Sequence, residues 1–152
     1  MGTLADGEFL RSLALTDSAF LERLGWSVVI RHDTEVTLGD LQRKGVVIYG
    51  DEEQNSAVAG LTGSFPIVPA GGSVEVGGET IRDSSLALIQ VVENPHMSDA
   101  LLCWIVPFGA TARSELRPYD RSWILVRGKE EIASGTWDVR DENLEVRFEP
   151  DS

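Results

Sequence analysis

The stretch Gly45–Val58 reads GVVIYGDEEQNSAV and has the order strand, polar loop, helix. Residues 45–49 are apolar on both faces, which is typical of a central strand in a parallel sheet. Asn55 or Asp51 is well suited to cap a helix from Ser56 to about Leu61. A strand, a glycine and a helix start in this order also form the place where nucleotide-binding folds hold a phosphate.

The chemistry of this loop does not suit a phosphate. Such loops use several glycines and usually a lysine, whereas this loop has only Gly50 and no lysine. Asp51, Glu52 and Glu53 occupy the place of the anion, and we expect them to satisfy the positive N-terminal end of the following helix themselves. The sequence therefore predicts no nucleotide and no other cofactor. A divalent cation held by the three acids is the less favoured alternative.

Upstream of this stretch, the apolar spacing predicts a helix over residues 6–25. Thr16-Asp17 offers an N-cap inside it, so a break into two short helices is an alternative. Gly25 is well placed to end the helix in a left-handed conformation. Residues 26–31 (WSVVIR) are typical of a strand, and Thr37 with Asp40 resembles a capping box that opens a short helix. Helices and strands thus alternate, which predicts a Rossmann-like half with parallel strands.

The second half is predicted to be rich in β-structure. Gly77-Gly78 lies between two short β-prone runs, residues 73–76 and 79–82, and indicates a hairpin. Further strands are predicted over 86–92, 101–107, 122–127, 131–137 and 144–148. The fold class is therefore α/β, in which a Rossmann-like half continues into a mixed or antiparallel half, as one domain over residues 1–152.

The net charge of the 152-residue chain is −12, from 13 basic and 25 acidic residues. Such a chain repels phosphate backbones and anionic membranes, so neither nucleic acid nor a membrane is an expected partner. No apolar run approaches the roughly 20 residues that span a bilayer, and the first residues do not resemble a signal peptide. The single cysteine, Cys103, lies in an apolar run and is predicted to be buried. The sequence leaves the compartment undetermined.

No catalytic motif is present, because the chain contains no G-x-S-x-G and its two histidines form no metal-binding pattern. Polar residues that follow predicted strands are the best candidates for a ligand site, since open α/β sheets bind ligands there. A dyad of His96 and Asp99 with a distant serine is a further alternative. The candidate ligand site comprises His32, Asp33, Asp51, Glu52, His96 and Asp99.

The order of elements over roughly residues 28–109 resembles a segment of bacterial secreted hydrolases of the prolyl-oligopeptidase-like class. The resemblance rests on VVIYG followed by a polar turn (residues 45–61), the hairpin VEVGGETIRD (74–83), a strand that ends in ENP (87–95), and a strand that ends near FG (101–109). In those hydrolases the catalytic serine and its partners belong to a separate domain. The resemblance implies a Rossmann-like accessory domain to which no family catalytic residue can be transferred.

Three functions are consistent with these observations. The first is a non-catalytic accessory or protein-interaction domain, which should expose an apolar patch where another domain docks. The second is a small enzyme or ligand-binding protein with a site near His32, Asp51 and His96. The third is a homo-oligomer formed by pairing of strand edges. The first is favoured, because no catalytic motif is readable.

Overall fold

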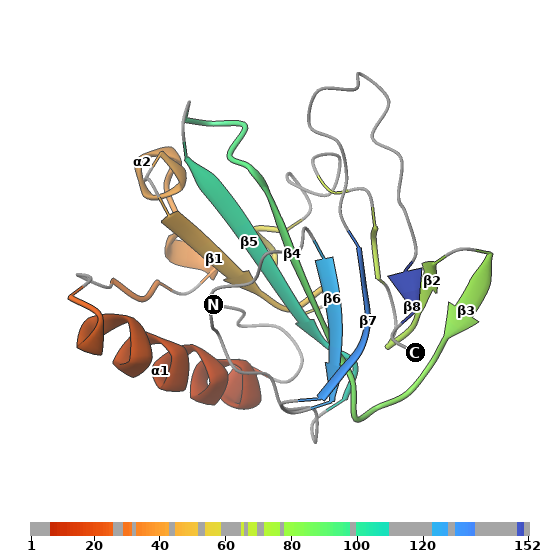
Figure 1. Ribbon diagram of the computed structural model, residues 1–152. Helices are drawn as coiled ribbons and strands as arrows, with labels where there is room; N and C mark the ends of the chain where they lie inside the picture. Colours follow the sequence, from red (N-terminus) through yellow and green to blue (C-terminus); the bar gives the residue numbers. More distant parts are fainter. Residues whose placement is uncertain are drawn as a thin grey trace.

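The computed structural model gives one chain whose elements form a main sheet packed on both faces (Figure 1). The residues that the structure describes are 7–25, 29–31, 33–42, 45–51, 54–58, 65, 67–69, 72–76, 78–97, 100–109, 123–127, 130–135 and 149–150.

Along the described part of the chain, the helical elements precede all of the strands. The helices are α1 (Gly7–Arg23), the 3-10 helix η1 (Asp33–Glu35) and α2 (Leu38–Leu41). The strands are β1 (Gly45–Tyr49), β2 (Val74–Val76), β3 (Glu79–Ile81), β4 (Ala87–Glu93), β5 (Leu101–Pro107), β6 (Trp123–Arg127), β7 (Glu130–Gly135) and β8 (Glu149–Pro150).

The main sheet has six strands in the order β1-β5-β4-β6-β7-β8. Only the β1–β5 pair is parallel among the described strands, and every other pair in this sheet is antiparallel. The hairpin β2–β3 forms a separate two-stranded sheet around the predicted Gly77-Gly78 turn. The fold is therefore α/β with a mixed sheet, as the sequence indicates at this level.

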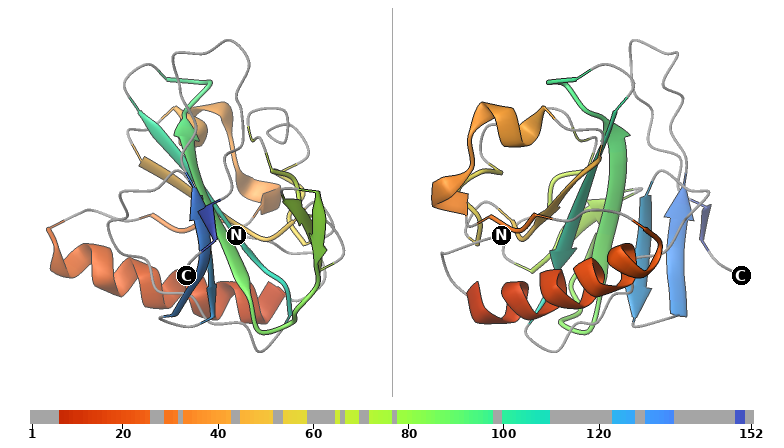
Figure 2. Two further views of the ribbon diagram at one scale, coloured as in Figure 1. Left: turned by 45° about the vertical axis from the view of Figure 1, so that its right-hand side comes forward. Right: turned by 90° about the vertical axis from the view of Figure 1, so that its left-hand side faces the viewer.

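The sheet is apolar on both faces because each face is covered by a different part of the chain. Helix α1 runs across one face at the end of the sheet where β1 and β5 terminate (Figures 1 and 2). Leu10, Leu13 and Ala14 of α1 pack there against apolar residues of the central strands. The opposite face holds the larger core, to which Trp104, Trp123 and residues from the β2–β3 hairpin contribute. A strand covered on both sides is apolar at nearly every position, which explains the run WILV and the run ALIQVV, where the buried Gln90 is the exception.

Helix α1 is continuous, so the alternative of a break at Thr16-Asp17 is wrong. The Thr16 hydroxyl donates back to the Ser12 carbonyl at 3.0 Å, as hydroxyls inside helices do. Asp17 points into the protein instead of capping a new helix. Gly25 ends the helix with φ +91° as predicted, and its N–H donates to the Glu22 carbonyl.

Two expected elements of the Rossmann-like half are not formed where the structure describes the chain. Residues 29–31, the described part of the predicted strand 26–31, are in no strand, and residues 56–58 form turns in place of the start of a helix. Asn55 and Asp33 explain the turns, because the Asn55 carboxamide accepts the Ala57 N–H at 2.9 Å and Asp33 accepts the Ser56 N–H at 2.8 Å. Side chains therefore satisfy donors in this turn, and the chain needs no helix there.

Most other predicted elements are confirmed. The capping box of α2 is present, since the Asp40 N–H donates to the Thr37 hydroxyl and the Thr37 N–H donates to the Asp40 carboxylate. Five predicted strands are also present. They are β3 (predicted over 79–82), β4 (86–92), β5 (101–107), β6 (122–127) and β7 (131–137). The predicted strand over residues 144–148 lies outside the described residues. Cys103, predicted to be buried, is half-buried and packed against the core cluster to which α1 contributes.

Candidate functional site

The loop after β1 is held by its own polar side chains. The Asp51 carboxylate accepts the N–H of Gln54 at 3.1 Å, and the Gln54 side-chain oxygen accepts the N–H of Asp51 at 3.1 Å. Asp51 is buried. Asp51 thus bonds within the turn, whereas the expected N-terminal end of a helix from Ser56 is not formed over the described residues 56–58. Glu52 and Glu53 lie outside the described residues.

Asp33 joins the same loop from a distant part of the chain. It lies buried in η1, and one of its carboxylate oxygens accepts both the N–H and the hydroxyl of Ser56, at 2.8 and 2.7 Å. Asp33 and Asp51 therefore bind the same short segment, residues 54–58. Both carboxylates contribute to the structure of this loop, and His32 lies outside the described residues.

We expect Asp33→Ala to lower the free energy of unfolding by about 1–3 kcal/mol, because hydrogen bonds to a charged acceptor contribute that much. Urea denaturation measures this effect, and Ser56→Ala is the matched control because it removes only the hydroxyl and keeps the N–H. The two substitutions should be non-additive, since they share one interaction. Additive effects, or an unchanged stability of Asp33→Ala, would contradict this assignment.

His96 lies at the other end of the sheet. It occupies the turn after β4, where its N–H donates to the Asn94 side-chain oxygen at 2.9 Å. The register places the end of β4 beside Leu101 and the start of β1, whereas Asp51 follows the end of β1. A five-residue strand is about 13 Å long from first to last residue. His96 and Asp51 are therefore not brought together, and Asp99 lies outside the described residues.

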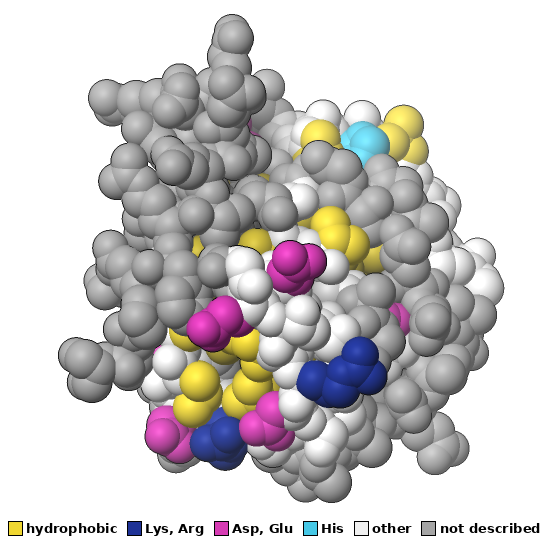
Figure 3. Space-filling model, turned by 90° about the vertical axis from the view of Figure 1, so that its right-hand side faces the viewer, with side chains coloured by type: hydrophobic (Ala, Val, Ile, Leu, Met, Phe, Trp, Pro, Cys, Tyr) yellow, Lys and Arg dark blue, Asp and Glu magenta, His cyan; other side chains and the backbone are white. Residues whose placement is uncertain are grey.

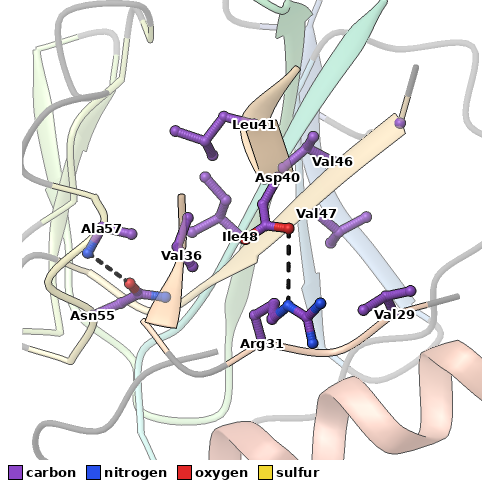
Figure 4. A pocket seen from close by; sticks show the side chains of 11 residues that line it. Val29, Arg31, Val36, Asp40, Leu41, Val46, Val47, Ile48, Asn55 and Ala57 are labelled. Carbon is purple, nitrogen blue, oxygen red and sulfur yellow. Dashed lines mark hydrogen bonds and ion pairs between the residues drawn. The ribbon is translucent and has the colours of Figure 1, made fainter. Parts of the chain in front are cut away.

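A cavity of about 120 Å³ lies beside β1 (Figure 4). Asn55 lines it, whereas the candidate residues Asp33, Asp51 and His96 do not. Arg31 and Asp40 form an ion pair at 3.8 Å in this region. The remaining lining residues are mostly aliphatic: Val29, Val36, Leu41, Gly45, Val46, Val47, Ile48 and Ala57. Sequence reasoning missed this cavity, since its walls come from four separate segments and no local motif marks it.

A buried polar pair lies between α1 and the sheet. The Tyr49 hydroxyl donates to the Asp17 carboxylate at 2.5 Å, and both residues are buried. Burial raises the pKa of Tyr49 far above its ordinary value of 10, and the charge of Asp17 and this hydrogen bond raise it further. The pair connects the helix to β1, and its burial suits a structural role better than contact with a substrate.

We expect Tyr49→Phe to cost about 1–3 kcal/mol near neutral pH, because it removes a donor from a buried carboxylate. The pKa of Tyr49 is raised by folding, so its contribution is complete below pH 10 and is lost as the pH rises above 10. The loss amounts to about 1.4 kcal/mol per pH unit. Urea denaturation between pH 8 and 11 should therefore show a smaller alkaline loss of stability for Tyr49→Phe than for the unmodified chain. If both proteins lose stability equally between pH 8 and 11, folding does not raise the pKa of Tyr49.

Among the described residues, no group of three or more His, Cys, Asp or Glu side chains is placed to hold a metal ion. No described helix has the length and apolar character needed to cross a membrane. On the side of the molecule that carries the β2–β3 hairpin, the described acidic and basic side chains are interspersed and form no patch of one sign (Figure 3).

The sheet face that α1 covers becomes more exposed from one row of residues to the next. The row Tyr49–Ile105–Ile89–Ile124 lies under α1 and is buried. The next row, Val47–Cys103–Val91, is half-buried. In the row after that, Leu101 is 57% exposed and lies between Gly45 and the exposed Glu93. We call Val47, Val91, Leu101 and Cys103 the open strip, because the first two and Cys103 are half-buried and Leu101 is exposed.

The comparisons with known proteins find no matching family model, no matching curated protein and no matching solved structure.

Proposed function

We propose that the chain is a non-catalytic accessory or protein-interaction domain that docks on another protein through the open strip. The observation that carries this proposal is the gradient of exposure along one sheet face. Aliphatic side chains that gather on an exposed sheet face mark a surface that another molecule covers in the working assembly. Helix α1 covers one end of this face, and the partner covers the other.

The described candidate residues support a role without catalysis. The carboxylates of Asp33 and Asp51 accept hydrogen bonds that hold the loop after β1, and His96 lies at the opposite end of β1 from Asp51. A small-molecule site requires polar groups that converge on one pocket, usually of about 300–1,000 Å³. The arrangement of these three residues therefore favours a docking domain over a small enzyme or ligand-binding protein.

The net charge of −12 supports a partner that is neutral or basic. Nucleic acids and anionic membranes are disfavoured by the same charge. Two copies of this chain would also repel each other, which makes a homo-oligomer the weaker form of the proposal. The partner we propose is a different protein domain with an apolar surface and a basic surround.

An origin as a Rossmann-like accessory segment of a hydrolase is the weaker part of the proposal. The parallel β1–β5 pair, with α1 against the sheet, supports it. Residues 29–31 lie outside any strand, which speaks against a full Rossmann-like half.

A photo-crosslinking amino acid placed at residue 101 tests the docking role in the cells that produce the chain. Residue 80 is the control position, since Thr80 is also exposed on a strand but lies in the β2–β3 hairpin. We expect a discrete adduct with one protein from position 101 and none from position 80. No adduct, or the same adducts from both positions, would refute docking through the open strip.

A further inference from the structure

The open strip ends in a row of residues that carries an acid. Gly45, Leu101 and Glu93 lie side by side in this row, since Gly45 pairs with Leu101 and Leu101 pairs with Glu93. Directly paired residues point their side chains to the same face of a sheet, so Glu93 lies on the face of the open strip. Glu93 and Leu101 are both exposed.

Glu93 is the only charged residue that strands β1, β4 and β5 place on this face. Its carboxylate forms no ion pair or side-chain hydrogen bond with the part of the chain that the structure describes. These three strands therefore supply no cation that could neutralise it. The other residues that they place on this face are Gly45, Val47 and Tyr49 of β1, Ala87, Ile89 and Val91 of β4, and Leu101, Cys103, Ile105 and Pro107 of β5.

An exposed acid beside an apolar contact determines the charge that a partner must bring. The side chains of Glu93 and Leu101 start about 5 Å apart, because the two residues are directly paired. A partner that covers Leu101 therefore also places side chains next to Glu93. An acidic side chain there would repel Glu93, whereas a lysine or arginine would pair with it. The methylene groups of such a side chain can also pack on an apolar surface while its charge stays in water.

We propose that the partner of the open strip places a lysine or arginine against Glu93, with the methylene groups of that side chain on Leu101. This inference rests on the proposed docking function, and it names the residue that selects a basic partner. The net charge of −12 attracts such a partner from a distance, and Glu93 fixes where its cation sits.

Charge reversal at Glu93 tests this inference. The partner captured by the crosslinker at residue 101 is identified by mass spectrometry, and its affinity for the chain with Leu101 in place is measured by calorimetry. We expect Glu93→Lys to weaken binding about tenfold or more, because it brings like charges together. Glu79→Lys is the matched control, since Glu79 is also an exposed strand acid and its reversal changes the net charge equally. Its affinity should stay within roughly twofold of that of the unmodified chain, because a distant surface charge is screened.

A charge swap in the partner locates the ion pair. The lysine or arginine of the partner nearest to the crosslinked position is changed to glutamate. This partner variant should bind the unmodified chain weakly and regain affinity for Glu93→Lys. Glu93→Gln removes the charge without reversing it, so it should weaken binding less than Glu93→Lys does.

The outcomes separate this inference from the docking function. Equal affinities of Glu93→Lys and Glu79→Lys, or a partner variant that Glu93→Lys does not rescue, would refute the ion pair and leave docking through the open strip intact. A captured partner that is a second copy of this chain would overturn the inference in favour of a homo-oligomer. Absence of any adduct at residue 101 would refute the docking function itself, and the ion pair with it.

Discussion

Gly50→Ala is expected to lower the free energy of unfolding by about 2–5 kcal/mol, because it combines backbone strain with overpacking. Gly50 has φ +97°, a left-handed conformation that costs a residue with a side chain about 1–2 kcal/mol. A methyl group there would also lie 2.9 Å from Leu10 Cδ1 and 2.9 Å from Gln54 Cβ. Overpacking of this kind typically costs a further 1–3 kcal/mol or so.

Gly50 connects three parts of the structure, which is why the effect should be large. Its N–H donates to the Ile105 carbonyl at 2.8 Å, and its carbonyl accepts the Trp104 indole N–H at 2.7 Å. Leu10 of α1 packs directly against it. A shift of the backbone that relieves the clash would therefore disturb the end of β1, the loop at Asp51 and the helix together.

Gly78→Ala is the matched control for this prediction. Gly78 has φ +81°, but nothing lies within 4 Å of the position that its methyl group would occupy. Gly78→Ala should therefore show only the conformational cost of about 1–2 kcal/mol. Urea denaturation measures the free energy of unfolding of both variants, and its slope against urea concentration should be unchanged. If the two substitutions destabilise equally, the close approach of Leu10 to Gly50 is without energetic consequence and the prediction fails.

Elements that depend on a few neighbouring residues could be predicted from the sequence. The capping box of Thr37 and Asp40, the end of α1 at Gly25 and the Gly77-Gly78 hairpin are of this kind. Each is decided by a local hydrogen bond or a local backbone preference, so it can be predicted without knowledge of the fold. The strands β4, β5 and β6 are also predictable, because their apolar runs are too continuous for an exposed segment.

The elements that failed depend on partners far away in the chain. Residues 29–31 are β-prone but lie in no strand, since a strand requires a neighbour with which to pair and propensity alone does not supply one. The helix expected from Ser56 is replaced by a turn because Asp33, 23 residues earlier, binds the Ser56 N–H. The sequence offers Asp17 as a cap, whereas in the fold it accepts a hydrogen bond from Tyr49, 32 residues later.

The candidate site likewise depends on contacts between distant residues, which the sequence does not reveal. The sequence identifies polar residues after strands, and Asp33 and Asp51 do bind one common loop, but their role is to hold that loop. The cavity beside β1 and the open strip arise from the packing of separate segments. The open strip can be recognised only from the strand register, which places its residues on the sheet face that also packs against α1.

Gln90→Leu is expected to destabilise the chain by about 2–5 kcal/mol, because it leaves two buried backbone groups without their partner. Gln90 is fully buried in β4. Its side-chain amide donates to the Ile67 carbonyl at 2.7 Å, and its side-chain oxygen accepts the Ile67 N–H at 3.3 Å. One side chain thus takes the place of a backbone partner for Ile67, and it attaches the segment around Ile67 to the sheet.

Leucine has a similar size, so the substitution tests the hydrogen bonds and not the filling of space. Ile67 is itself buried, and its N–H and carbonyl would lose their partner where water does not reach, at a cost of about 1–3 kcal/mol each. The neighbouring residues on the same face are Trp104 and Trp123, which pair with Gln90 on either side. Both indole rings are buried, so they shield the amide from the water that would otherwise replace it.

Gln54→Leu is the matched control, since the Gln54 side chain also accepts a backbone N–H, that of Asp51, but is only partly buried. Water can replace this bond, so the cost should stay below about 1 kcal/mol. Amide hydrogen exchange adds a local measure, because the Ile67 N–H should lose its protection in Gln90→Leu and keep it in Gln54→Leu. If Gln90→Leu remains within 0.5 kcal/mol or so of the unmodified chain, Gln90 does not hold this segment, and the core on the hairpin side of the sheet must be stabilised by its apolar residues alone.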